Sequence, residues 1–215
     1  MDIKYLITDV DGVIFDRMPV YLSAITEVLR PFNIPKDLIR SYYYGTLGTP
    51  IELQTRGILN KFGMTVSEEC LGKMVKNFWD MCAVSPTNLF SGVKETLDKV
   101  KRQGIFLMAS SGSQTADLAK YFKEYDLPYD LFLGSDRVLK GDKHINIFAD
   151  HFSLEKKDFC RQAAFIGDGT TDMQIAARNG IFGIGITNTI SAETLLASGA
   201  EVIVSDISEI FSYFK

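Results

Sequence analysis

The sequence has no long hydrophobic run and no excess of positive charge. Its uninterrupted apolar runs, such as residues 105–109, are short, whereas roughly 20 apolar residues are needed to span a bilayer. The 27 acidic residues outnumber the 23 basic ones, so the formal net charge is −4. Nucleic-acid-binding proteins usually carry a basic face instead. We therefore expect no membrane span and no nucleic-acid partner.

Cysteine and histidine are also scarce, and this limits the available chemistry. The three cysteines, Cys70, Cys82 and Cys160, include no Cys-x-x-Cys pair that could hold zinc or carry out redox reactions, and we interpret them as buried thiols. The two histidines, His144 and His151, lie seven residues apart in a predicted helix, and we interpret them as solvated or capping side chains. An enzyme of this composition would use carboxylates, hydroxyls, lysines and a hard metal ion that prefers oxygen ligands.

The remaining composition is that of an ordinary globular protein. Hydrophobic residues make up 46% of the chain and charged residues 23%, which is sufficient to form a core. The N-terminal residues lead directly into a strand-like segment and lack the basic stretch and apolar core of a signal peptide. We expect a cytoplasmic protein that is a monomer or a small homo-oligomer.

Strand-like and helix-like segments alternate over most of the chain. Short apolar, β-branched runs predict strands at residues 4–10, 105–109, 130–133, 163–166, 181–186 and 201–204. Helical periodicity lies between them, at residues 92–103, 113–125, 144–152, 170–179 and 191–198. This alternation predicts an α/β fold with a Rossmann-like parallel sheet and helices on both faces.

Residues 17–88 interrupt the alternation. They contain four consecutive helical patterns, at residues 20–32, 37–43, 51–62 and 67–82, and Ser67 is a suitable cap for the last of these. We therefore predict two domains. Residues 1–16 and 89–215 would form an α/β catalytic core, and residues 17–88 an all-helical cap that moves on hinges near residues 17–19 and 87–91.

Acidic residues follow two of the predicted strands. Asp9 and Asp11 come directly after the first strand, and Asp168 and Asp172 follow the fourth. Ligands bind at the carboxyl ends of the strands in open parallel sheets, so these side chains should meet. Converging carboxylates repel one another unless a cation lies between them, and oxygen ligands suit Mg²⁺. The sequence therefore predicts a magnesium site.

Hydroxyl groups follow the second predicted strand at Ser110 and Ser111, just before a helix. Backbone N–H groups at a helix start, with hydroxyls beside them, can bind a phosphate. This segment by itself is more typical of an ordinary helix cap. Next to the carboxylates, anion binding is the better interpretation.

These segments together resemble the motifs of the haloacid dehalogenase-like hydrolase superfamily. The segment from Asp9 to Asp16 is similar to its first motif, Asp-x-Asp-Gly-x-x-x-Asp after an apolar strand. Ser110 resembles the second motif, and Gly-Asp-x-x-x-Asp ending at Asp172 resembles the fourth. The helical insertion at residues 17–88 resembles the family's cap in its commonest position. The resemblance covers essentially the whole chain.

The third motif of the family is a lysine, for which this sequence offers Lys140 and Lys143. The gap of 25 residues between Lys143 and Asp168 would suit a member with short loops. The apolar stripe that begins at Ile145 favours Lys140 instead. Its gap of 28 residues is explained if residues 155–161 contain extra loop residues.

The resemblance implies a role for each residue. Asp9 would be the nucleophile and form an aspartyl-phosphate, and Asp11 would be the general acid and base. Asp9, the backbone carbonyl of Asp11 and Asp168 would hold Mg²⁺, with Asp172 as a further ligand or a support to the ligands. Phosphoryl oxygens would be bound by Ser110, Ser111 and Lys140, with Lys143 as the alternative.

The resemblance also implies the reaction and its alternatives. Because dehalogenases of the superfamily lack the second aspartate, its presence here favours phosphoryl transfer. We expect a phosphatase acting on a small phosphorylated metabolite. A sugar-phosphate mutase resembling β-phosphoglucomutase is the alternative, and a receiver-like signalling module is a remote one. The tyrosines in the predicted cap loop, residues 41–50, would either reach the substrate or pack in the core of the cap.

Overall fold

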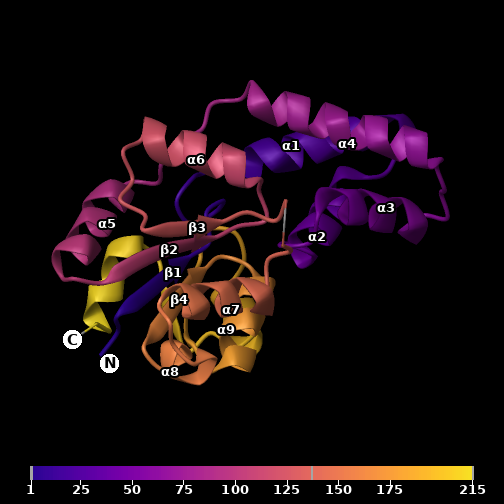
Figure 1. The fold of residues 1–215 in the computed structure, drawn as a ribbon. Helices are drawn as coiled ribbons and strands as arrows, with labels where there is room; N and C mark the ends of the chain where they lie inside the picture. The colour runs from indigo at the N-terminus through magenta and orange to yellow at the C-terminus, as the bar shows by residue number, and fades with distance from the viewer. Residues whose placement is uncertain (1, 137, 215) are drawn as a thin grey trace.

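The structure, a computed structural model that describes residues 2–136 and 138–214, contains one parallel six-stranded sheet (Figure 1). The strand order is β3-β2-β1-β4-β5-β6, with every neighbouring pair parallel. The strands are β1 (Tyr5–Thr8), β2 (Phe106–Ser110), β3 (Leu131–Leu133), β4 (Ala163–Gly167), β5 (Phe182–Ile186) and β6 (Val202–Val204). The predicted fold class is confirmed, and the strand that leads to Asp9 lies in the middle of the sheet.

Helices cover both faces of the sheet because successive side chains of a strand point to opposite faces. Leu6 of β1 packs into one hydrophobic cluster, and its neighbours Tyr5 and Ile7 pack into another. The first cluster is closed by α5 (Val93–Arg102), α6 (Thr115–Glu124) and the 3₁₀ helix η2 (Ile207–Ser212). The second is closed by α7 (Asp142–His151), α8 (Lys156–Cys160) and α9 (Thr170–Asn179). A short helix, α10 (Ala192–Ala197), packs against β5 and β6.

The helices that follow β1 have a hydrophobic core of their own. They are α1 (Met18–Leu29), the 3₁₀ helix η1 (Arg30–Phe32), α2 (Lys36–Gly45), α3 (Ile51–Lys61) and α4 (Glu68–Ala83), and Figure 1 shows them to one side of the sheet. Their core includes Ile25, Ile58 and Phe78. Ser67 caps α4 as expected, because its hydroxyl accepts a hydrogen bond from the backbone N–H of Cys70 at 3.2 Å. The limits of a separate cap, residues 17–88, stay a prediction.

Two helices differ from the sequence prediction. Residues 156–160 form α8, where we expected extra loop residues, because one helical turn is too short to show a periodic pattern. Helix α2 continues to Gly45, so Tyr42, Tyr43 and Tyr44 lie on a helix and the loop is confined to residues 46–50.

The cysteines and the helix lengths complete the comparison with the sequence. Cys82 and Cys160 are buried free thiols as expected, whereas Cys70 is half-buried near the start of α4. Within residues 2–136 and 138–214, every helix is too short or too polar to cross a membrane.

Candidate active site

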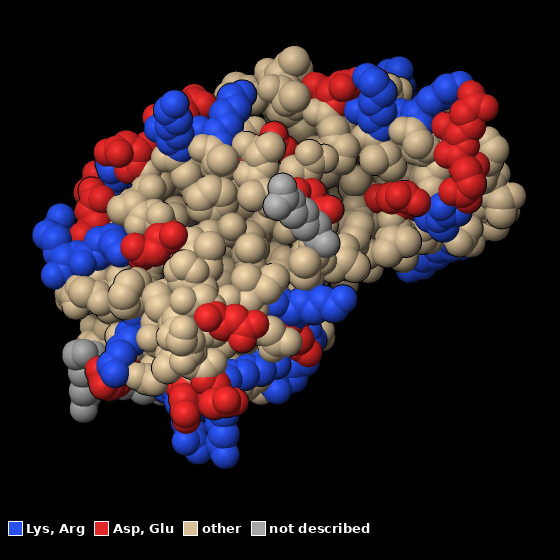
Figure 2. All heavy atoms as spheres, viewed as in Figure 1, with Lys and Arg blue, Asp and Glu red and all other residues tan. Residues whose placement is uncertain are grey.

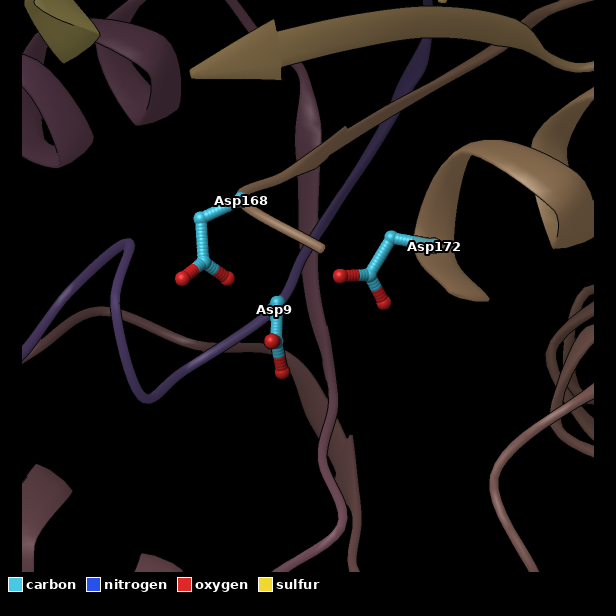
Figure 3. A group of neighbouring side chains, drawn as sticks. All are labelled: Asp9, Asp168 and Asp172. Carbon is cyan, nitrogen blue, oxygen red and sulfur yellow. The ribbon is translucent and has the colours of Figure 1, made fainter. Parts of the chain in front are cut away.

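Three carboxylates, the half-buried Asp9 and the buried Asp168 and Asp172, meet where β1 and β4 end (Figure 3). Asp9 follows β1, Asp168 follows β4, and Asp172 lies in the first turn of α9. One oxygen of each carboxylate lies within 4.8 Å of one oxygen of the other two. Three of the four carboxyl groups that we expected to meet therefore lie together in the structure.

Glycines make this convergence possible. Gly12 has a φ of +88°, and a Cβ at this position would lie 1.9 Å from Oδ2 of Asp168. Gly167 passes equally close to Asp172, since a Cβ there would lie 2.3 Å from its Cβ. A larger residue at either position would displace one of the carboxylates.

Lys140 is the cation of this cluster. Its ammonium Nζ lies 2.8 Å from Oδ1 of Asp9 and 2.7 Å from Oδ1 of Asp172, and its side chain is only 3% exposed. The backbone N–H of Lys140 donates to the hydroxyl of Ser135 at 3.0 Å. Lys143 is exposed on the first turn of α7. Of the two candidate lysines, Lys140 is the one that reaches the carboxylates.

Burial is the largest influence on the pKa values of the cluster, and the charges of its members modify them. Burial raises the pKa of Asp9, although the ion pair with Lys140 opposes the shift. Burial and the charges of Asp9 and Asp172 raise the pKa of Asp168 well above its usual value. Burial also raises the pKa of Asp172, to about 6, against the effect of Lys140. Although burial alone would lower the pKa of Lys140, its two carboxylate partners raise it.

The carboxylate of Asp11 lies outside this cluster and has different partners. The Ser113 hydroxyl donates to its Oδ2 at 2.8 Å, and Nε of Arg17 lies 3.9 Å from its Oδ1. Neither Ser113 nor Arg17 was among the predicted site residues. Ser113 belongs to the same polar segment after β2 as the predicted serines, so the sequence did contain a signal for it.

The hydroxyl groups of the two predicted phosphate-binding serines contact partners other than the carboxylates. The Ser110 hydroxyl lies 2.9 Å from Nδ1 of His144. The Ser111 hydroxyl accepts a hydrogen bond from the Ser113 backbone N–H at 3.0 Å. Ser110 nevertheless lies on the same face of the sheet as Asp9, one strand away, because β1 and β2 pair with Thr8 opposite Ala109.

His144 corrects the interpretation of the histidines, because its ring is completely buried rather than solvated. Its Nε2 lies 2.8 Å from the backbone carbonyl of Val138, which can only accept a hydrogen bond. Nε2 therefore carries the proton of the neutral ring. Nδ1 must then accept, so the Ser110 hydroxyl is the donor in the bond to His144. His151 is exposed as predicted.

A cavity of about 290 Å³ lies between the carboxylates and the helices that follow β1. Figure 2 shows acidic and basic side chains interspersed over this face of the molecule. The opposite wall includes Tyr21, Tyr43, Gln54 and Trp79. Within residues 17–88, all of which the structure describes, no charged side chain lines the cavity. Of the three consecutive tyrosines, Tyr43 reaches the cavity, and its two neighbours pack against the core of the helices.

The fold and the site together define a class of protein. The parallel sheet has acidic residues after its central strands, a lysine paired to them and a cavity beside them. These features are typical of an α/β enzyme whose active site is built from carboxylates at the strand ends. The family model described as "Haloacid dehalogenase-like hydrolase" matches residues 6–186. The chain belongs to this family, as its motifs predicted.

Comparison with individual proteins agrees with this assignment. The chain is 28% identical to the "Probable phosphatase IndB" of Dickeya dadantii, over 95% of this chain and 90% of the relative. It is 25% identical to a phosphoglycolate phosphatase of Vibrio parahaemolyticus, over 97% and 95%. The crystal structure of a predicted phosphoglycolate phosphatase from Haemophilus somnus has the same fold, with a TM-score of 0.79, 18% identity and coverage of 99% and 98%. These relatives agree with the predicted phosphatase branch of the family.

Proposed function

We propose that this protein is a Mg²⁺-dependent phosphatase that hydrolyses a small phosphorylated metabolite through an aspartyl-phosphate on Asp9. The observation that carries the proposal is the pairing of Asp9 with Lys140 at 2.8 Å, inside a cluster of two further buried carboxylates. A carboxylate attacks a phosphate monoester poorly because both are anionic, so nearby positive charge is required. Asp11, two residues from Asp9, supplies a separate group for proton transfer.

The site fits a magnesium ion by its chemistry. Three carboxylates converge against one ammonium, and burial, with a further contribution from the neighbouring carboxylates, raises the pKa values of Asp168 and Asp172. Mg²⁺ prefers such oxygen ligands. Asp9, Asp168 and the backbone carbonyl of Asp11 would hold the ion, with Asp172 as a further ligand or a support. When bound, the ion would screen the charge of the phosphoryl group.

The protein's own residues then divide the reaction into two steps. In the first, a carboxylate oxygen of Asp9 bonds to phosphorus while the bond from phosphorus to the alcohol oxygen breaks, and Asp11 gives that oxygen a proton. In the second, Asp11 takes a proton from a water molecule that attacks phosphorus and releases phosphate from Asp9. Lys140 would bind phosphoryl oxygens in both steps, and Ser110 and Ser111 would assist from β2.

The cavity indicates which substrates to test first. The wall that faces the carboxylates is aromatic and uncharged, and it offers the Tyr21 and Tyr43 hydroxyls and the Gln54 amide. Such a wall suits the uncharged body of a phosphorylated alcohol better than a second anionic group. A panel should therefore pair sugar and nucleoside monophosphates with phosphorylated acids such as phosphoglycolate.

The nucleophile is tested with Asp9→Asn, which keeps the shape of the side chain but cannot attack phosphorus. We expect turnover of the best substrate to fall about a thousandfold or more, with the thermal unfolding temperature little changed. Retention of a tenth of the wild-type turnover would exclude the covalent mechanism. Incubation with β-glucose 1-phosphate and a trace of the 1,6-bisphosphate tests the mutase alternative, because isomerisation without phosphate release would contradict hydrolysis.

A further inference from the structure

Arg17 is a buried cation for which the proposed reaction provides no role. It directly precedes α1, and the residue is only 4% exposed. Its guanidinium lies between two aromatic rings, 4.9 Å from the centre of Tyr21 on α1 and 5.0 Å from the centre of Tyr121 on α6. One of its nitrogens donates to the backbone carbonyl of Cys82 on α4 at 3.5 Å. The side chain thus contacts α1 and α4, which belong to the helices that follow β1, and α6, which packs against the sheet.

Burial of a guanidinium costs free energy unless an acidic partner compensates it. Asp11 is the acidic residue within ion-pair distance of Arg17 in the described part of the chain, with Nε of Arg17 3.9 Å from Oδ1. The aromatic rings on either side favour a cation but do not neutralise it. The charge of Arg17 is therefore directed towards the carboxyl group that the proposed function uses for proton transfer.

The two oxygens of Asp11 are held from different directions. Oδ2 accepts the hydrogen bond of Ser113 at 2.8 Å, and Oδ1 faces Arg17. Two different partners at the two oxygens limit rotation of the carboxyl group about its last bond. A general acid must lie within hydrogen-bond reach of the leaving oxygen in a fixed direction. Restriction of this rotation would therefore contribute directly to proton transfer.

We propose that Arg17 is a positioning residue that holds the Asp11 carboxyl group in one orientation for both of its proton transfers, to the leaving group and, as the carboxylate, from the attacking water. The inference rests on the proposed role of Asp11. Since Tyr21 and Cys82 belong to α1 and α4 while Tyr121 belongs to α6, the orientation of Arg17 also depends on how these helices lie against one another. Asp11 is then correctly oriented when the helices over the cavity occupy the arrangement seen in this structure.

The experiment compares two phosphate monoesters that differ in their need for an acid. p-Nitrophenolate leaves as a stable anion, whereas the alkoxide of β-glycerol phosphate must be protonated as it leaves. Asp11→Asn should reduce kcat for β-glycerol phosphate about a hundredfold or more, and much less for p-nitrophenyl phosphate. Arg17→Gln should reproduce this selectivity, with a loss of about tenfold on the alkyl ester and less than about threefold on the aryl ester.

Arg17→Lys and Arg161→Gln complete the set. Arg17→Lys keeps the charge but loses the flat fork that stacks between the rings, so it should show the same selectivity more weakly. Arg161, 64% exposed and paired with Asp158 away from the cavity, is the matched control and should leave both rates unchanged. If Arg17→Gln does not fold, the rate ratio of Arg17→Lys decides the question.

The outcomes separate the inference from the function on which it rests. Equal losses on both esters for the Arg17 variants, with a selective loss for Asp11→Asn, would overturn the positioning role alone. Equal losses for Asp11→Asn would overturn the acid role of Asp11 and the inference together. A selective loss in both sets of variants would support both.

Discussion

Lys140 illustrates how strongly one residue can depend on its surroundings. Its ammonium is buried and lies within 2.8 Å of Asp9 and of Asp172, an arrangement that burial alone would disfavour. The carboxylates favour the charged form of the lysine and raise its pKa, and the lysine in turn opposes the rise that burial causes in the pKa of Asp9. Each partner therefore favours the charged form of the other.

Removal of this ammonium should affect catalysis far more than removal of its exposed neighbour. We expect Lys140→Ala to lower kcat/KM at saturating Mg²⁺. The loss of transition-state stabilisation should be about 3–4 kcal/mol, as is found when one preorganised partner of a developing charge is removed. Lys143→Ala should change kcat/KM by less than about twofold. Steady-state kinetics on the best substrate measures both. A larger loss for Lys143→Ala would contradict the assignment.

His144 makes the stability of the fold depend on pH. Burial lowers the pKa of His144 below the ordinary value of 6.5, and the nearby charge of Lys140 acts in the same direction. The unfolded chain therefore binds a proton at a higher pH than the folded chain does. The stability associated with the neutral ring is complete above about pH 6.5, and it is lost as the pH falls through the lowered pKa.

Measurement of the free energy of unfolding of variants at several pH values tests the direction of this pH dependence. We expect His144→Asn to cost about 1–3 kcal/mol at pH 7, because the Ser110 and Val138 hydrogen bonds are disturbed. The difference from the wild type should narrow towards pH 5, where the buried histidine itself becomes unfavourable. Urea unfolding at pH 5, 6 and 7 measures it. His151→Asn, an exposed position on the same helix, serves as the control, and a gap that widens on acidification would contradict the argument.

At the scale of elements, the helices over the cavity depend on local signals at their ends as well as on their core. Helix α4 begins after Ser67, whose side chain accepts the N–H of Cys70, and its first turn carries Glu68 and Glu69. Negative charge at a helix start interacts favourably with the helix dipole. These features were readable from the sequence because they involve residues within one turn.

Loss of this cap should reduce stability without affecting the chemistry. Ser67→Ala is expected to lower the free energy of unfolding by about 1 kcal/mol, whereas Ser67→Asn should restore most of it because asparagine is an equally good cap. Chemical denaturation measures the stabilities, and kcat should be unchanged in both variants. A loss of kcat in Ser67→Ala without a loss of stability would mean that the α4 terminus takes part in the reaction.

For the whole molecule, the concentration of negative charge at one point is a source of instability. The chain as a whole is only mildly acidic, at −4, but Asp9, Asp168 and Asp172 gather in one buried cluster. Folding brings these charges together, and a bound cation would offset their repulsion. Metal binding should therefore appear as a change in the stability of the folded state.

We expect Mg²⁺ to raise the thermal unfolding temperature, by an amount that corresponds to about 2.7 kcal/mol at 100 times its dissociation constant, and EDTA to reverse the effect. Asp168→Asn should remove most of this stabilisation, while Asp158→Asn, at an exposed site, should not. The effect should weaken below about pH 6, because Asp172, whose pKa is raised to about 6, must lose its proton to act as a ligand or a support. Equal stabilisation of Asp168→Asn and the wild type would contradict the proposed ligand set.

Much of the fold could be predicted from local patterns. The six strands were located to within about two residues at each end, because apolar β-branched runs between turn residues are a property of short segments. Helix α8 and the end of helix α2 were not predicted, because their local patterns are weak or misleading. The first is too short for its period to be read, and the second contains three tyrosines and a glycine that favour a loop on composition alone.

The sequence by itself determined the parallel sheet, the helical insertion and the carboxylates at the strand ends, because side-chain periodicity and the alternation of strands with helices are properties of neighbouring residues. Only the tertiary structure decided that Lys140 reaches Asp9, that His144 is buried against Ser110 and that Arg17 lies beside Asp11. Each of these contacts joins different segments, and its energy depends on the burial and charge that the folded chain creates. A polar side chain in the sequence does not reveal whether its partner will be water or a buried group from another element.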